Sequence, residues 1–323
     1  MEAALIRPLI TPSICPVAEL QKDQQYESEK IENIHHPKAK RTIIMSRQHM
    51  GHQARKRFGQ NFLHDHNVIR NIVKSIRPKE GDNIVEIGPG MGAITELLLE
   101  ATEGHLNVVE LDRDLIPGLK VKFFNNPGFV IHEADALKFD FAKLKVDERP
   151  LRIVGNLPYN ISTPLIFHLL SYSGTVKDMH FMLQKEVVQR MAAGPGEKNY
   201  GRLSIMAQYF CQVQHLFDVG PEAFSPAPKV DSAIVRLAPY ETLPHPVKDH
   251  RTLENVVRTS FSMRRKTLRN NLKKVISSEQ LENLGIDPSL RPERLSLAEF
   301  VLISDYIFDN KINGTYSSEN KDD

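Results

Sequence analysis

The sequence is poor in cysteine, lacks tryptophan and contains no long apolar run. Its only cysteines are Cys15 and Cys211, which stand far apart in the chain. Without Cys-x-x-Cys pairs, neither a disulfide scaffold nor a structural zinc site is predicted, and a reducing compartment is expected. No stretch approaches the roughly 20 apolar residues that a membrane-spanning helix needs. The 13 histidines show no metal-ligand spacing, so we predict no bound metal.

An excess of charge of one sign is also missing. The 323 residues include 42 Lys and Arg and 40 Asp and Glu, which gives a formal net charge of +2. Hydrophobic residues make up 41% and charged residues 25%, as in ordinary soluble globular proteins, and this argues against a collagen-like or fully disordered chain. The length suggests about two domains, each large enough to bury a core.

Residues 1–50 differ from the rest of the chain. They follow neither the helical nor the strand period, so we predict a disordered or poorly ordered extension. A secretory signal is not expected, because the apolar core of such a signal is missing. The six acidic residues before Met45 argue against a mitochondrial transit peptide, since transit peptides are poor in acids. Met45 and Met50 stand just before the first strong pattern, so an over-extended start is one interpretation.

Strands and helices alternate regularly from residue 65 onward. Apolar residues from Val68 to Ile76 follow the helical period, with Asp65 and Asn67 as candidate caps and Pro78 as the stop. Strands are expected at Asn83–Ile87 and from near Leu106, Phe129, Leu151 and Met179. This alternation predicts an α/β fold in which a parallel sheet is covered by helices on both faces.

The remainder of the chain adds two strands and then only helices. The runs Cys211–Val219 and Ser232–Leu237 have no helix between them, so they are expected to pair antiparallel at one end of the sheet. Beyond Pro239 we expect one helix from Leu253 to Leu272 and another over Leu295–Ile307. The predicted organisation is a sheet domain over residues 51–240, a small all-α domain over 241–309 and a flexible tail over 310–323.

Ligand-facing residues follow the first three strands. Gly88 and Gly90 close the first strand, where glycine permits a tight turn and a close approach to a ligand. Glu110 ends the second strand about 20 residues after Gly90, the place where a carboxylate accepts hydrogen bonds from ribose hydroxyls. Asp135 follows the third strand and is suited to accept a hydrogen bond from an adenine amine. At this point the residues fit a dinucleotide as well as S-adenosylmethionine.

The fourth strand ends in Gly155-Asn156-Leu157-Pro158-Tyr159. An adenine amine is a poor nucleophile, because its lone pair is delocalised into the ring. The Asn156 side-chain oxygen and the Leu157 carbonyl are suited to accept from the two amine N–H groups, which frees that lone pair. Pro158 stiffens the turn, and Tyr159 offers a face on which a flipped-out base stacks. The motif is similar to the Asn-Pro-Pro-Tyr and Asn-Leu-Pro-Tyr motifs of enzymes that methylate exocyclic amines.

Together these motifs resemble the class I S-adenosylmethionine-dependent methyltransferases. The segments that resemble one family of this class, the ribosomal RNA adenine dimethyltransferases, are Arg55–Leu63, Asn156–Tyr159, Phe224–Val230 and Ser262–Lys266. The resemblance covers residues 55–307. It implies a Rossmann-like sheet of seven strands, mostly parallel with one antiparallel, followed by a small all-α C-terminal domain.

The resemblance also implies an activity and a set of roles. Methyl groups would pass from S-adenosylmethionine to two adjacent adenines in the 3′-terminal hairpin of 16S rRNA, with S-adenosylhomocysteine as product and no metal. Residues implied to bind the cofactor are Asn61, Leu63, Gly88, Gly90, Glu110, Asp135 and Asn156. Phe224 is implied to close the base pocket opposite Tyr159; the alternative is a proline-stiffened hairpin tip with a buried phenylalanine.

Basic residues gather in two segments. Arg251–Lys274 holds eight basic residues and one acid, and Arg47–Arg77 holds seven and one. Such segments bind phosphates without sequence specificity; a solvated helix face is the alternative. We predict RNA contacts at Arg55, Lys56, Arg57, Arg264, Arg265, Lys266 and Arg269, of which the last four form the basic side of the helix expected at Leu253–Leu272.

Two other functions remain as alternatives. The related erythromycin-resistance methyltransferases modify an adenine of large-subunit rRNA, but Arg55–Leu63 and Ser262–Lys266 favour the small-subunit enzyme. A non-catalytic nucleic-acid binder, like the mitochondrial transcription factors of this fold, is disfavoured by the intact Asn156 and Tyr159. We expect a cytoplasmic monomer that binds 16S rRNA in the 30S subunit or its precursor, touches no membrane and also acts in subunit assembly.

Overall fold

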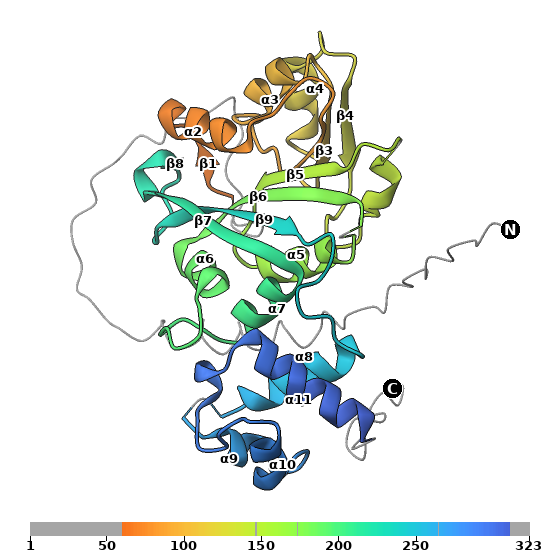
Figure 1. Ribbon diagram of the computed structural model, residues 1–323. Coiled ribbons are helices and arrows are strands. Elements are labelled where there is room, and N and C mark those ends of the chain that lie inside the picture. Colours follow the sequence, from red (N-terminus) through yellow and green to blue (C-terminus); the bar gives the residue numbers. More distant parts are fainter. Residues whose placement is uncertain (1–59, 146, 173, 264, 311–323) are drawn as a thin grey trace, which may run out of the picture.

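The computed structural model describes residues 60–145, 147–172, 174–263 and 265–310. The predicted N-terminal extension, the tail beyond 310, and the predicted RNA contacts Arg55, Lys56, Arg57 and Arg264 lie outside these residues. A seven-stranded sheet forms the centre of the molecule (Figure 1). From one edge to the other its strands are β4 (Phe129–Glu133), β3 (Leu106–Glu110), β2 (Asn83–Ile87), β5 (Leu151–Asn156), β6 (Val176–Gln184), β9 (Ser232–Pro239) and β7 (Cys211–Val219).

The strand directions confirm the predicted sheet. The five strands from β4 to β6 run parallel, and β9 runs antiparallel to both of its neighbours. The last two strands of this sheet in chain order, β7 and β9, therefore pair with each other as expected, and β9 is its one antiparallel strand. It follows β7 in sequence but lies between β6 and β7, because the chain turns back after β7 and fills the place beside β6.

Both faces of the sheet are covered by helices, as alternate residues of β2 show. Ile84 packs into a buried cluster with α2 (His66–Ile76), α3 (Thr95–Ala101) and α4 (Ile116–Lys122). Its neighbour Val85 packs into a second cluster with α5 (Ser162–Leu170) and α6 (Lys185–Ala192) on the opposite face. Because side chains of a strand alternate between faces, a sheet buried on both sides needs apolar residues at successive positions.

The prediction of one helix from Leu253 to Leu272 is wrong, because the structure has two helices there. α8 (His250–Ser260) ends eight residues into that span, and α9 (Leu268–Leu272) begins after a turn. The Leu268 N–H donates to the Leu290 carbonyl at 2.8 Å, and the buried Asn271 side chain donates to the Met263 and Lys266 carbonyls at 3.4 Å each. These bonds fix a turn instead of a further helical repeat. Arg265 and Lys266 therefore lie in this turn and not on a helix face, and only Arg269 is on α9.

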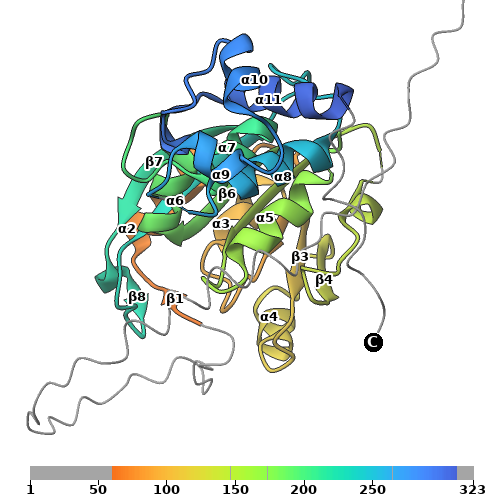
Figure 2. The ribbon, with the colours of Figure 1, turned by 90° about the horizontal axis from the view of Figure 1, so that it is seen from below.

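The C-terminal helices pack against the sheet domain through α7 (Arg202–Phe210) (Figure 2). One buried cluster joins Ile205 and Tyr209 of α7 with Val256 of α8 and Phe300 of α11. The remaining elements are α10 (Ser278–Asn283), α11 (Leu297–Asp309), short 3₁₀ turns at Phe141–Leu144, Pro221–Ala223 and Pro292–Arg294, and the two-stranded pair of β1 (Phe62–Leu63) and β8 (Phe224–Ser225). Within the described residues, no helix is long and apolar enough to cross a membrane.

Candidate active site

The predicted ligand-binding residues meet at one edge of the sheet. Ile87, the last residue of β2, pairs with Val109 of β3 on one side and with Gly155 of β5 on the other. Glu110 at the end of β3 pairs with Glu133 at the end of β4. Because these strands are parallel and in register, the residues that follow them emerge side by side at the carboxyl edge, the usual ligand-binding edge of such sheets.

Glycines shape the turn that follows β2. Gly88 and Gly90 have φ angles of 66° and 60°, the left-handed region that strains any residue with a Cβ atom. The Gly88 N–H donates to the Val109 carbonyl at 2.9 Å, which fixes the turn against β3. Gly155 was quoted in the sequence motif but given no role. A Cβ atom there would lie 2.6 Å from the Ile87 carbonyl oxygen, so a side chain at this position would push β5 away from β2.

Glu110 is a buried carboxylate at the centre of this edge. Only 6% of the residue is exposed, and burial raises its pKa even though the Gly90 and Asp112 backbone N–H groups donate to it. The Asp112 N–H donates at 2.7 Å. A buried acceptor held by the glycine turn is well placed for a ligand that brings hydroxyl donors.

Asp112 and Gln60 were missed by the sequence analysis. Asp112 is 2% exposed, and its carboxylate accepts a hydrogen bond of 2.7 Å from the Gln60 side chain. This bond ties the segment before β1 to the end of β3. The available signal was an acid two residues after Glu110 at a strand end, together with a glutamine just before Asn61.

Asp135 is half-buried and accepts from the Leu137 N–H at 3.0 Å, which holds its side chain at the turn after β4.

Asn156 is oriented by the segment that precedes β1. Its side-chain nitrogen donates to the Asn61 carbonyl at 3.2 Å, so its side-chain oxygen is the group left to accept from a ligand. The next residue, Leu157, is buried and donates its N–H to the Met182 carbonyl at 3.2 Å. The Tyr159 hydroxyl lies 3.0 Å from the Ser232 hydroxyl of β9, which fixes the half-buried tyrosine ring from its far end.

The β1–β8 pair brings the two outer motifs together. Leu63 pairs with Phe224, and the His64 N–H donates to the Ala223 carbonyl at 2.9 Å. Leu63 is 7% and Phe224 4% exposed, and both side chains belong to the apolar cluster under α2 and α3. The fold thus joins the Phe224 segment to the segment whose Asn61 contacts Asn156, while most of the Phe224 ring is packed as a buried phenylalanine. Its role at the base pocket stays a prediction.

Glu86 is a second buried carboxyl group that the sequence analysis did not single out. It lies within β2, two residues before the glycine turn, and is 2% exposed. The Thr95 hydroxyl at the start of α3 donates to it at 2.6 Å. Burial raises its pKa to about 7, and the nearby Glu110 adds to the shift.

A comparison with known proteins assigns the chain to a family. The model of the family "Ribosomal RNA adenine dimethylase" matches residues 51–309. The chain belongs to this family.

Its relatives in this family are similar over most of their length. "Ribosomal RNA small subunit methyltransferase A" of Marinobacter nauticus is 69% identical over 265 residues, which cover 82% of this chain and 95% of the relative. The protein of that name in Hahella chejuensis is 63% identical, with coverage of 82% and 97%. A solved dimethyladenosine transferase from Plasmodium falciparum matches with a TM-score of 0.65 and 28% identity, over 78% of this chain and 98% of that one. The 23S rRNA methyltransferase ErmE matches with a TM-score of 0.60 at 21% identity, which shows the shared fold.

Three of the basic residues predicted to bind RNA are among the described residues. Arg265 and Lys266 are exposed in the turn between α8 and α9, and Arg269 is exposed at the start of α9. Met263, in the same turn, is 46% exposed.

No group of three or more possible metal ligands occurs among the described residues. As a member of the adenine dimethylase family, the chain is an S-adenosylmethionine-dependent methyltransferase.

Proposed function

We propose that this protein dimethylates two adjacent adenines in the 3′-terminal hairpin of 16S rRNA, in the small ribosomal subunit or its precursor. The observation that carries the proposal is the oriented Asn156 amide at the same sheet edge as Glu110, in a chain 69% identical to a small-subunit rRNA methyltransferase. It acts as a cytoplasmic monomer and also takes part in subunit assembly.

The residues at the carboxyl edge fit S-adenosylmethionine. Glu110 is a buried acceptor at the end of β3 that would take hydrogen bonds from a ribose diol. Asp135 would accept from the adenine amine of the cofactor, and the left-handed turn at Gly88 and Gly90 would let its methionine part approach the backbone closely. Asn61 and Leu63 line the same site from the β1 side. The cofactor supplies an electrophilic methyl group.

The chain's own contribution to the reaction is orientation. In the first transfer the Asn156 side-chain oxygen and the Leu157 carbonyl accept hydrogen bonds from the two N–H groups of the target amine; in the second transfer one N–H remains to donate. These bonds direct the nitrogen lone pair to the methyl group. Tyr159, held by Ser232, stacks on the flipped-out base, and Pro158 stiffens the turn between them. Phe224 borders the pocket from β8. No strong base is required, because the proton leaves after the amine has become cationic; most of the rate enhancement comes from positioning.

RNA binding rests on basic groups of the helical region and of the segment before β1. Arg265, Lys266 and Arg269 are exposed at the α8–α9 turn, and Arg55, Lys56, Arg57 and Arg264 are proposed to add to them. Phosphate contacts of this kind position the RNA and carry no sequence information. Specificity comes instead from the shape of the rRNA and from adenines that are easily unstacked.

The test is methyl transfer from labelled S-adenosylmethionine to unmethylated small subunits, with large subunits in parallel, followed by nucleoside analysis. We expect N6,N6-dimethyladenine from small subunits alone. Label in the large subunit would assign the chain to resistance-type methylation instead. RNA binding without transfer would make it a binding protein that has lost catalysis.

A further inference from the structure

The outer face of α2 carries a row of cations. Ile69, Ile72 and Ile76 are buried in the cluster beneath the helix. On the opposite side Arg70, Lys74 and the C-terminal cap Arg77 are exposed. Arg70 and Lys74 are four residues apart and so lie on one face of the helix, about 6 Å apart along the axis. Arg77 follows directly after the helix as its left-handed cap, with a φ of 51°. The helix itself contains no acidic residue.

These three cations form no ion pair with a carboxylate within the described part of the chain, in contrast to some of the other exposed cations. Exposed cations that pair with a carboxylate elsewhere include Arg113, Arg149, Arg190, Lys248 and Arg291. The polar side-chain contact of the row is from Arg70 to the neutral Asn67 side chain at 2.7 Å. Local pairing therefore does not explain why a helix presents these residues.

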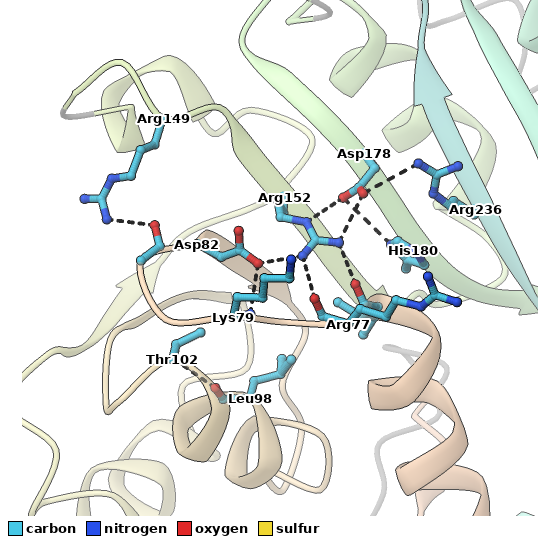
Figure 3. Close-up of polar contacts among 12 residues, drawn as sticks. Arg77, Lys79, Asp82, Leu98, Thr102, Arg149, Arg152, Asp178, His180 and Arg236 are labelled. Carbon is cyan, nitrogen blue, oxygen red and sulfur yellow. Dashed lines mark hydrogen bonds and ion pairs between the residues drawn. The ribbon is translucent and has the colours of Figure 1, made fainter.

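The helix is fixed at both ends. At its start the Asp65 carboxylate accepts from the Asn67 and Val68 N–H groups. At its end the buried Arg152 guanidinium donates to the Ile76 carbonyl at 2.6 Å and to the Arg77 carbonyl at 3.2 Å (Figure 3). Arg152 is held in turn by Asp178 and Asp82. The row is thus preorganised, which lowers the entropy lost when a partner binds.

The helix that carries the row is joined to the candidate active site through β1. Asn61, just before β1, contacts Asn156; α2 begins three residues after the end of β1 and ends where Arg152 of β5 donates to the Ile76 carbonyl. Figure 1 shows α2 between α3 and the β1–β8 pair. On α3, Glu96 and Glu100 are exposed, and Glu96 pairs with Lys122. These acids repel an anionic strand, so they favour a path along the β8 side of α2.

We propose that Arg70, Lys74 and Arg77 form a phosphate-binding ridge, which holds the RNA strand that flanks the target adenines on the side opposite the helical region. This inference rests on the proposed function. A row of unneutralised cations without acids fits the sugar–phosphate backbone, and arginine binds phosphate in a bidentate manner. The target RNA is then held at two places, the α2 ridge and the α8–α9 turn, with the base pocket between them.

The test compares two triple variants of the full chain that lose the same charge. R70Q/K74Q/R77Q removes the ridge, and R149Q/R190Q/K248Q removes two arginines and one lysine that are ion-paired on the surface. Binding to unmethylated small subunits is measured at several KCl concentrations, and methyl transfer is measured with saturating subunits. For the ridge variant we expect at least about tenfold weaker binding at 0.1 M salt, a log–log salt slope reduced by about 2 to 3, and little change in kcat. The control variant should keep the wild-type slope.

Three outcomes would overturn the inference. One is an unchanged slope in the ridge variant while the wild type binds and methylates small subunits. Another is an equal loss in both variants, which would reduce the effect to net charge. The third is a ridge variant that keeps the wild-type salt slope for small-subunit binding but no longer binds phosphatidylserine vesicles, which would assign the ridge to a lipid surface. Failure of the wild type itself to bind or methylate small subunits would instead refute the proposed function.

Discussion

Single polar side chains at the sheet edge are held by main-chain groups of distant segments. The Asn156 amide is oriented by the Asn61 carbonyl, and Glu110 is held by the N–H groups of Gly90 and Asp112. Main-chain partners of this kind do not rotate away, so the side chains are fixed before a ligand arrives. Orientation of the amide decides which of its atoms faces the target amine.

Replacing Asn156 by alanine should abolish most methyl transfer and leave RNA binding intact. The variant removes the acceptor for the target amine and no cation, so kcat should fall by at least about 100-fold, the usual size for one aligned hydrogen-bonding group at a reacting centre. Methyl transfer and small-subunit binding are measured side by side. Asn156→Asp is the matched variant. It keeps an acceptor but loses the donor to the Asn61 carbonyl, so its kcat should lie between those of the wild type and Asn156→Ala. Normal methylation by Asn156→Ala would refute the assigned role.

Glu86 makes the free energy of unfolding depend on pH. Its pKa is about 7 in the folded protein because it is buried, against 4.5 for a free glutamate, so the folded state binds the proton more tightly. The contribution of Glu86 to the free energy of unfolding is therefore fully present below about pH 4.5. It is lost as the pH rises through about 7, which lowers the free energy of unfolding by up to about 3 kcal/mol. Urea unfolding at pH 5 and pH 8 should show this loss in the wild type and less of it in Glu86→Gln, which keeps an acceptor for Thr95. Equal losses in both proteins would contradict the assignment.

Helices and strands of the sheet domain could be predicted because each residue type agrees with its place. The α2 helix begins after Asp65, its predicted cap, and the strand-end acids emerge at one edge because parallel strands end together. The break after α8 could not be predicted, since both helices around it contribute to one apolar cluster and keep the helical period. The burial of Phe224 and the position of β9 depend on contacts between residues far apart in the chain, which no local pattern encodes.

The junction of α2, β5 and β6 depends on one buried ion cluster. Replacing Arg152 by methionine would leave the buried Asp178 with only the more distant Arg236, at 3.8 Å, and would remove the ion-pair partner of Asp82; it should lower the free energy of unfolding by about 3 kcal/mol. Arg149→Met is the matched control, because its partner Asp147 is exposed and such pairs contribute about 1 kcal/mol or less. Chemical denaturation of the two variants measures the difference. Similar losses would mean that the buried cluster adds no more than a surface pair.

Across the whole molecule, one apolar core crosses the predicted domain boundary at residue 240. Ile205 and Tyr209 from the sheet side pack with Val256 and Phe300 from the helical side. Arg202 of α7 also pairs with Glu254 of α8 at 3.5 Å. Because the sheet part and the helical part bury surface against each other, we expect them to unfold together. Their division into two domains at this boundary stays a prediction.

Calorimetry should therefore show a single unfolding transition. Because removal of the C-terminal helices would expose the α7 side of the shared cluster, the sheet domain should not melt separately from them. The van't Hoff and calorimetric enthalpies of the whole chain should agree, as they do for one cooperative unit. Two resolved transitions would show instead that the parts are energetically independent. Measurement without cofactor avoids stabilisation of one part by a ligand.

The short pair of β1 and β8 has a consequence for the order of events in synthesis. Its two halves come from opposite ends of the sheet domain, so the earlier half leaves the ribosome long before its partner exists. Contacts with such separation in the chain form late, because a long loop has to close first. The β1–β8 pair, which joins the segment of Asn61 to the segment of Phe224, is thus among the last parts of the sheet domain to form. A nascent chain can build most of its sheet and still lack a closed pocket, so its catalytic competence arises only when nearly the whole sheet domain has been translated.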